Sequence, residues 1–395
     1  MLRIVADENI PLAGEAFGSL GEIRLLPGHA ITAAAVRAAD VLLVRSVTRV
    51  DGALIAGSRL RFVGSATIGT DHVDVAALAA ARIPFHYAPG SNAESVVEYV
   101  LAALLSLAAR RGVALRGTTI GVVGCGAIGS RLVARLPALG MRVLANDPPL
   151  AAAAERQDAP HAFAPLAQVL AEADVITLHV PLTTAGPFPT RHLVDAAELR
   201  RMRPAAWLVN TSRGAVVANG ALRASLESGV PGAVVLDVWE GEPEPDPELI
   251  AHCALATPHI AGYSYDGKVA GTLMMYDALV RELGIASTWD GSAALEMSAR
   301  ASAVLRPSAW TPGADAVAEA RWLHALVRQV CDIEADDVRM RTLLTLPAGD
   351  RARGFQELRR SYPRRRSFSR YVLPENEIPA PLQRAVREGL RIRPD

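Results

Sequence analysis

One stretch, TIGVVGCGAIGSRLV at residues 119–133, restricts the fold more than any other part of the 395-residue chain. It passes from an apolar, strand-like segment through three glycines into a segment with helical spacing. In a G-x-G-x-x-G pattern the first glycine permits a tight turn, the second lets a pyrophosphate approach the backbone, and the third lets helix and strand pack closely. The stretch therefore predicts a dinucleotide-binding β-α-β unit, with phosphate contacts at Gly124, Gly126, Ala127, Ile128 and Gly129.

A carboxylate follows at the distance that such a unit requires. The next apolar segment, MRVLAND, ends at Asp147, about 20 residues after the glycines, where a carboxylate would accept hydrogen bonds from the adenosine ribose hydroxyls. The same charge would repel a 2′-phosphate, so the sequence predicts NAD rather than NADP. A structural turn followed by a solvated aspartate is the alternative.

Short apolar runs alternate with segments of helical length along most of the chain, which is typical of parallel sheets covered by helices. A long helix at 92–111 separates two series of predicted strands. The strands lie at 2–6, 41–44, 61–64 and 83–86, then at 119–124, 141–147, 174–179, 205–210, 232–237 and 253–258. We therefore predict an α/β protein with two tandem flavodoxin- or Rossmann-like parallel-sheet domains.

The pattern changes from about residue 286. The rest of the chain carries tryptophans and arginines and has only weak strand signals, as in DVRMRTLLTL at 337–346. We predict a small C-terminal α+β domain there. Residues 351–370 hold eight arginines and a single acidic residue, Glu357. A solvated or subunit-facing basic surface would explain them, and so would an arginine that completes a phosphate site.

Charge and composition argue against several classes of protein. The formal net charge is zero, so the overall charge offers no attraction to nucleic acid or to an acidic membrane. Cys125, Cys253 and Cys331 are far apart and lack the spacing of a zinc site, so we expect no metal and a reducing, cytoplasmic location. No apolar run reaches the roughly 18 residues of a membrane span, and the N-terminus lacks a signal-peptide core.

Three side chains with catalytic chemistry follow successive predicted strands. Arg213 follows AAWLVN, Glu242 lies in the loop after GAVVLD, and His259 comes just after CALATP. Ligands bind at the carboxyl ends of the strands in open α/β sheets. Hydride transfer from a secondary alcohol needs a base, a group that tunes the base and a cation for the substrate's carboxylate. Each residue has an ordinary structural explanation as well, but the three together beside a dinucleotide motif favour an active site.

At these residues the sequence resembles the D-2-hydroxyacid dehydrogenases. The resemblance rests on GVVGCGAIGSRL, HVPLT, NTSRGAVV, LDVWEGEP and TPHIAGYS, which occur in that order between residues 90 and 265. It implies that Arg213 binds the substrate, that His259 is the acid/base and that Glu242 is the partner of the histidine. Further contacts with NAD are expected in the loops after the strands, at Val180, Thr211, Asp237 and Gly262.

The resemblance also implies the domain limits. A substrate domain would cover 1–91 and be completed by a return helix at 264–285. The NAD domain would cover 92–263, and 286–395 would form a dimerisation domain. The expected protein partner is therefore a second copy of the chain.

Segments outside the NAD domain would select the substrate. VRSVTRV, GSATIGTDHVD and FQELRRSYPRRRSF are similar to one subgroup of the family, whose substrate is a phosphorylated 2-hydroxy acid. That similarity implies substrate contacts at Arg45, Ser46, Thr67 and Tyr263. Two alternatives stay open: a dehydrogenase for another acid such as 3-phosphoglycerate, and an NAD-sensing corepressor of the same fold.

Overall fold

The computed structural model describes residues 1–155, 157, 162–291 and 304–395, which group into two compact units. Unit 1 contains Met1–Glu94 and the segment that begins at Tyr263, and unit 2 contains Ser95–Gly262 and the C-terminal residues. The chain therefore passes from one unit to the other after Glu94 and after Gly262. Within the described residues, no helix is both long enough and apolar enough to cross a bilayer.

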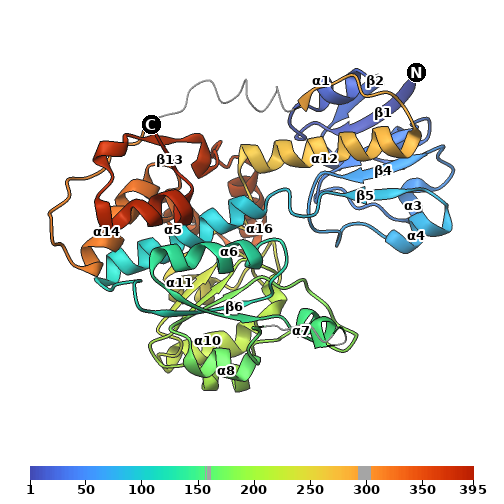
Figure 1. Ribbon diagram of the computed structural model, residues 1–395. Coiled ribbons are helices and arrows are strands. Elements are labelled where there is room, and N and C mark those ends of the chain that lie inside the picture. Colours follow the sequence, from blue (N-terminus) through green and yellow to red (C-terminus); the bar gives the residue numbers. More distant parts are fainter. Residues whose placement is uncertain (156, 158–161, 292–303) are drawn as a thin grey trace. The chain divides into compact units, whose positions relative to one another are not determined.

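Unit 1 is built on a five-stranded parallel sheet (Figure 1). Its strand order is β2-β1-β3-β4-β5, the flavodoxin-like order. Its central strands are buried on both faces, as their unbroken apolar sequences require. The strands are β1 (Leu2–Asp7), β2 (Gly21–Leu26), β3 (Val41–Val44), β4 (Phe62–Ser65) and β5 (Phe85–Tyr87).

Helices cover both faces of this sheet. One face packs on α1 and α12, through Phe17 and Tyr276 among others, and the other face packs on α2, α3 and α4. Asp51 and Asp74 begin two of these helices by accepting backbone N–H bonds. The helices are α1 (Ala13–Gly18), the 3-10 helix η1 (Gly28–Ala30), α2 (Ala33–Val36), α3 (Gly52–Ile55), α4 (Val75–Ala80) and α12 (Tyr265–Leu283).

Unit 2 is built on a six-stranded parallel sheet with the order β11-β10-β9-β8-β6-β7. The order reverses at β6, so this strand marks the point where an open α/β sheet binds its ligand. The strands are β6 (Thr119–Val123), β7 (Arg142–Asn146), β8 (Val175–Leu178), β9 (Trp207–Asn210), β10 (Ala233–Leu236) and β11 (Leu255–Ala256).

The helices of this sheet follow its strands in sequence, preceded by the long helix α5. They are α5 (Ala93–Arg111), α6 (Gly129–Arg135), η2 (Leu136–Leu139), α7 (Pro148–Glu155), α8 (Leu166–Glu172), α9 (Ala196–Arg201), η3 (Gly214–Val216), α10 (Asn219–Glu227) and α11 (Pro247–His252). The predicted α/β fold class with two tandem parallel-sheet domains is confirmed, and the C-terminal residues, predicted as α+β, add helices and a small two-stranded sheet.

The C-terminal residues pack on the core of unit 2. Met340, Leu343 and Phe355 belong to the same buried cluster as the helices and strands of the nucleotide-binding sheet. Their elements are α14 (Ala316–Arg328), α15 (Ile333–Arg341), η4 (Thr342–Thr345), α16 (Ala348–Arg360), η5 (Phe368–Arg370), β12 (Val372–Leu373), η6 (Glu375–Glu377), η7 (Ala380–Leu382), the π-helix η8 (Ala385–Leu390) and β13 (Arg393–Pro394).

The weak strand signal at 337–346 was wrong, because these residues form the end of α15 and the 3-10 helix η4. Asp332 begins α15 by accepting the N–H of Ala335, and Ile333 and Met340 bury one side of the helix. In this segment helical spacing of the buried residues outweighs the apolar LLTL run. The role of 286–395 in dimerisation stays a prediction, and the part of it at 292–303 lies outside the described residues.

Candidate active site

The residues assigned to cofactor and catalysis all lie in unit 2, each just after a strand of the six-stranded sheet. Arg213, Glu242 and His259 follow β9, β10 and β11, which are neighbours in the sheet. The glycine loop and Asp147 follow β6 and β7, which also are neighbours. Because all six strands are parallel, these side chains meet at one edge of the sheet.

The three glycines of the loop between β6 and α6 meet three different steric requirements. Gly124 has a φ of 88°, and a methyl group on it would lie 2.8 Å from the Val180 side chain. A methyl group on Gly129 would lie 1.9 Å from the Gly124 carbonyl oxygen, so only glycine lets helix and strand approach this closely. Gly126 instead faces open space, with no atom within 4 Å of an added methyl group. The loop thus offers a pyrophosphate the close backbone approach that the motif predicts.

Asp147 holds the same loop from the end of β7. One carboxylate oxygen accepts the N–H of Cys125 at 2.8 Å, and the other accepts the N–H of Leu150 at the start of α7. The carboxylate is only partly buried, so it keeps room for further hydrogen bonds. A negative charge fixed beside the glycine loop fits ribose hydroxyls and does not fit a 2′-phosphate.

A neutral histidine lies behind the glycine loop. His179 is bonded through Nε2 to Thr177 at 2.8 Å and through Nδ1 to Thr211 at 3.4 Å. Burial of the ring lowers the pKa of His179 to about 3, so it carries no charge near neutral pH. His179 therefore adds no charge beside Thr211.

His259 and Glu242 form a hydrogen-bonded pair. The Nδ1 atom of His259 lies 2.7 Å from Oε2 of Glu242, and the other carboxylate oxygen accepts the N–H of Trp239 at 2.9 Å. Burial would raise the pKa of Glu242, but the charge and hydrogen bond of His259 outweigh it and lower that pKa. Glu242 is therefore ionised near neutral pH and fixes one face of the imidazole, which leaves Nε2 for chemistry.

The backbone of His259 is held in an uncommon conformation. Its φ is 58°, in the left-handed region that residues other than glycine rarely adopt. Asp237, which is 1% exposed, accepts the N–H groups of Ile260 and Ala261 and the hydroxyl of Thr257. Burial raises the pKa of Asp237, and these bonds and the charge of His259 partly offset that effect. Asp237 thus fixes the loop that carries His259, residues 257–262, which we call the histidine loop. Its contact with the cofactor stays a prediction.

Arg213 begins η3 after β9. The Asn210 side chain donates to the Arg213 carbonyl oxygen at 3.0 Å and accepts the N–H of Ser212, which fixes the turn. A methyl group on Gly214 would lie 1.9 Å from the Trp239 carbonyl carbon. Glycine therefore lets this turn lie directly against the loop that leads to Glu242.

The C-terminal residues supply contacts that the sequence did not indicate. Arg365 is 5% exposed and donates to the carbonyl oxygens of Ser95 at 3.0 Å and Ala261 at 2.9 Å. Arg365 therefore fixes the loop that carries His259 through the carbonyl oxygen of Ala261. The charge of Arg359, in α16, also helps to lower the pKa of Glu242. The FQELRRSYPRRRSF motif contains both residues, but it does not indicate these contacts, because the partners are distant in sequence.

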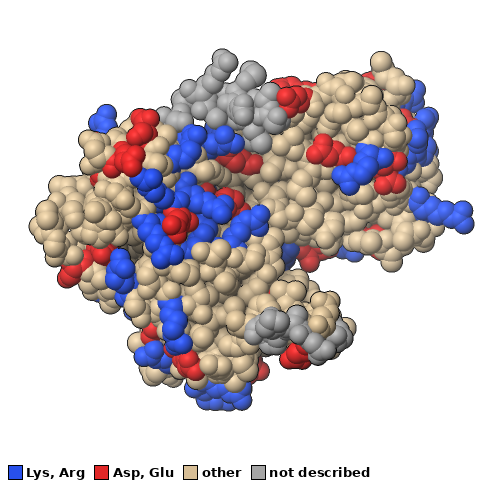
Figure 2. All heavy atoms as spheres, viewed as in Figure 1, with Lys and Arg blue, Asp and Glu red and all other residues tan. Residues whose placement is uncertain are grey.

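Other arginines of this segment lie on the surface. Figure 2 shows basic side chains gathered over the part of unit 2 that the C-terminal residues form, with acidic ones among them. Several are paired: Arg360 with Glu357, and Arg384 with Glu388. Exposed pairs of this kind contribute little stability. The arginine-rich segment thus combines a solvated surface with buried arginines.

The residues assigned to the substrate lie in unit 1. Arg45 and Ser46 follow β3, Thr67 follows β4, and Tyr263 precedes α12. The Thr67 hydroxyl lies 2.7 Å from that of Ser65 and donates to the Gly69 carbonyl oxygen. Arg45, Ser46 and Thr67 therefore share the carboxyl-terminal edge of one sheet, and their contact with substrate stays a prediction.

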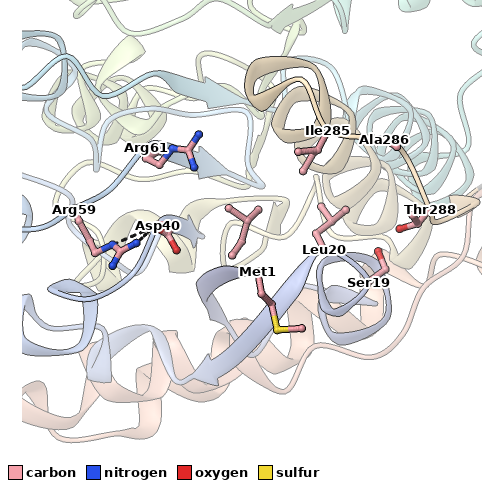
Figure 3. Close-up of a pocket in the computed structure, with 10 residues that line it drawn as sticks. Met1, Ser19, Leu20, Asp40, Arg59, Arg61, Ile285, Ala286 and Thr288 are labelled. Atoms are coloured by element: carbon pink, nitrogen blue, oxygen red, sulfur yellow. Dashed lines mark hydrogen bonds and ion pairs between the residues drawn. The ribbon is translucent and has the colours of Figure 1, made fainter.

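The cavity in unit 1 that Figure 3 shows lies at the opposite edge of that sheet. Its volume is about 410 Å³, and its lining includes Asp40 and Arg61, which directly precede β3 and β4. Arg59 closes one side through an ion pair with Asp40 at 2.7 Å. Because parallel sheets bind ligands at the carboxyl ends of their strands, this cavity is no substitute for the edge at Arg45. Within the described residues, no group of three or more potential ligands could hold a metal.

Comparison with known families matches two parts of the chain. Residues 98–261 match the D-isomer specific 2-hydroxyacid dehydrogenase, NAD binding domain, and residues 311–385 match a domain of unknown function. This part of unit 2 is thus an NAD-binding domain. The glycine loop and Asp147 fit the group on steric and electrostatic grounds.

Three full-length relatives carry one name. Erythronate-4-phosphate dehydrogenase of Salinibacter ruber is 54% identical over 100% of this chain and 99% of its own. Those of Pseudomonas aeruginosa, strain UCBPP-PA14, and Azotobacter vinelandii are 48% and 49% identical, each over 93% of this chain and 94% and 93% of their own lengths.

Solved structures share the fold. A protein of Thermus thermophilus is 27% identical, with a TM-score of 0.60 over 72% of this chain and 98% of its own. D-lactate dehydrogenase of Aquifex aeolicus, complexed with NAD and lactic acid, is 24% identical, with a TM-score of 0.58 over 71% of this chain and 95% of its own. Both likenesses cover less of this chain than the full-length relatives do.

Proposed function

The chain belongs to the D-isomer specific 2-hydroxyacid dehydrogenase family, and we propose that it is an erythronate-4-phosphate dehydrogenase. The reaction is the NAD-dependent oxidation of 4-phospho-D-erythronate at C2 to 2-oxo-3-hydroxy-4-phosphobutanoate. The observation that carries the chemistry is the pair formed by His259 and Glu242, with 2.7 Å between Nδ1 and Oε2. The substrate assignment rests on the names of relatives that match the chain along its whole length.

Each catalytic residue has one task in this proposal. When bound, NAD accepts the hydride that leaves C2. His259 removes the C2 hydroxyl proton through Nε2 and returns it in the reverse direction. Glu242 orients the ring through Nδ1 and stabilises its protonated form. Arg213, planar and always charged, binds the C1 carboxylate with paired hydrogen bonds.

A direct assay tests the proposal. Purified protein is mixed with NAD and 4-phospho-D-erythronate, and NADH formation is followed by fluorescence beside reactions with 3-phosphoglycerate and D-lactate. We expect the highest kcat/KM with 4-phospho-D-erythronate. A higher value with another acid would reassign the substrate, and tight NADH binding without turnover of any acid would favour a corepressor.

The biological setting follows from the same likeness. We propose that the enzyme acts in the cytoplasm, in pyridoxal 5′-phosphate biosynthesis, and that it is a homodimer joined through its C-terminal residues. Sedimentation of the full chain as a monomer would contradict the dimer.

Asp147 is expected to set the preference for NAD. Because a like charge beside the 2′-phosphate is strongly unfavourable, NADP should bind at least about tenfold more weakly than NAD. Asp147→Asn should reduce this preference, since the amide oxygen can still accept the Cys125 N–H while the charge is removed. Fluorescence titrations with NADH and NADPH measure both effects. Equal affinities in the unsubstituted protein would contradict the role of Asp147.

Glu242→Gln is expected to change the pH dependence of oxidation. The lowered pKa of Glu242 keeps its carboxylate charged until the pH falls through that lowered value, so the pair with His259 persists across the working range. Without this charge the protonated ring is less stable, and the acid limb of the kcat/KM profile should move to lower pH. An unmoved profile would make Glu242 purely structural.

A further inference from the structure

Helix α12 places Lys268, the only lysine in the chain, at the substrate edge of unit 1. The helix runs along β4: a methyl group on Gly64 would lie 3.0 Å from the Met275 sulfur, and one on Gly271 would lie 3.0 Å from the Ala66 carbonyl oxygen. Residues three and seven positions apart share a helix face. Lys268, three positions before Gly271, therefore lies just beyond the carboxyl end of β4.

At this edge Lys268 lies among residues already assigned to the substrate. Its Nζ atom lies 4.6 Å from the centre of the Tyr263 ring. Burial, followed by the charge of Arg45, lowers the pKa of Lys268 to about 8. Arg45 is thus close enough for its charge to act on the amine, although it comes from the loop after β3.

Lys268 and Arg45 act on each other as like charges. After burial, the charge of Arg45 is the second cause that lowers the pKa of Lys268. Two positive charges held together in a partly buried place repel each other, and a bound anion removes that repulsion. The hydroxyl of Ser46, exposed in the same loop as Arg45, adds a hydrogen-bond donor.

The charge of this cluster indicates which anion it takes. A phosphate monoester carries about two negative charges near neutral pH and has three acceptor oxygens, so it matches two cations and a hydroxyl. A carboxylate carries a single charge. The substrate of the proposed reaction carries such a phosphate monoester at C4.

We infer that Lys268 and Arg45 together bind the phosphate group of the substrate, with Lys268 as a phosphate ligand rather than a packing residue. This inference rests on the proposed function for the identity of the substrate. The presence of an anion site at Lys268 does not depend on turnover, so it can be tested separately.

Substrate kinetics provide the first test. Lys268→Met should raise the KM for 4-phospho-D-erythronate by about 10- to 100-fold, the effect of one charged hydrogen bond, and should raise the KM for D-erythronate, which lacks the phosphate, much less. Lys268→Arg should restore part of the affinity. The matched control is Arg61→Met, because Arg61 is an exposed cation at the opposite edge of the same sheet. This variant should change the KM for neither substrate. Equal effects of Lys268→Met on both substrates, or no effect, would overturn the inference.

Chemical modification provides the second test. Trinitrobenzenesulfonate reacts with neutral amines, and in this chain the amines are Lys268 and the N-terminus of Met1. At pH 8.5, inorganic phosphate should slow modification of Lys268 relative to Met1, while sodium chloride of equal ionic strength should not. Peptide mass spectrometry measures both sites. Absence of protection would overturn the inference, whereas protection without turnover of 4-phospho-D-erythronate would overturn the proposed function alone.

Discussion

His259→Ala is expected to lower kcat by about 10²- to 10⁴-fold, because the variant lacks the base that accepts the C2 hydroxyl proton. The Kd for NADH should stay within about twofold of the original value, since the glycine loop and Asp147 lie after other strands. Steady-state kinetics and NADH fluorescence titration measure the two quantities. The combination would place the loss in the chemical step.

A matched control uses a second histidine of unit 2. His252 is exposed at the end of α11, and its Nδ1 lies 2.7 Å from the Glu248 carbonyl oxygen. His252→Ala should leave kcat and KM unchanged. If His259→Ala retained near-normal turnover, another residue would have to be the acid/base, and the pair with Glu242 would be structural.

Phe355→Ala is expected to destabilise the whole of unit 2 by about 3–5 kcal/mol, the usual cost of removing a fully buried aromatic ring. Phe355 is 0% exposed and lies in α16, yet its cluster includes residues of the nucleotide-binding sheet. Thermal unfolding followed by calorimetry should show the transition that NADH stabilises move to lower temperature.

The control for this prediction is Phe188→Ala, because Phe188 is 40% exposed in the same unit and should cost little. If Phe355→Ala instead lowered only a separate transition that NADH does not affect, the C-terminal residues would unfold as a domain of their own. The packing of Phe355 argues for shared unfolding. A segment that served only to join two subunits would not need a ring in the core of its own protomer.

The fold was predictable wherever burial on both faces leaves a continuous apolar run. β3 and β9 are of this kind, and both were predicted from sequence. β2 was missed because it pairs with β1 alone, at the edge of the sheet, and its residues are mostly half-buried or exposed. The segment 337–346 was predicted as a strand but begins within α15. Its apolar residues have the spacing of a helix that is buried on one side only.

Some residues of the candidate site could be proposed from sequence, and others could not. Arg213, Glu242 and His259 could be proposed from sequence because the ends of parallel strands meet at one edge whatever the intervening helices do. Lys268 could not, because its place depends on how α12 packs along β4. The bonds of Arg365 join residues that are up to 270 positions apart, and no local pattern records such a contact.

The contact between Arg365 and Ala261 also sets the order in which the molecule can be completed during its synthesis. The two residues are 104 positions apart, so the histidine loop leaves the ribosome long before the arginine that holds it. Ser95, the other acceptor, is made earlier still. Both acceptors flank the points where the chain passes between the units. A chain released between residues 262 and 365 would therefore contain the NAD motif and every proposed catalytic residue and still lack the bond that fastens the loop carrying His259.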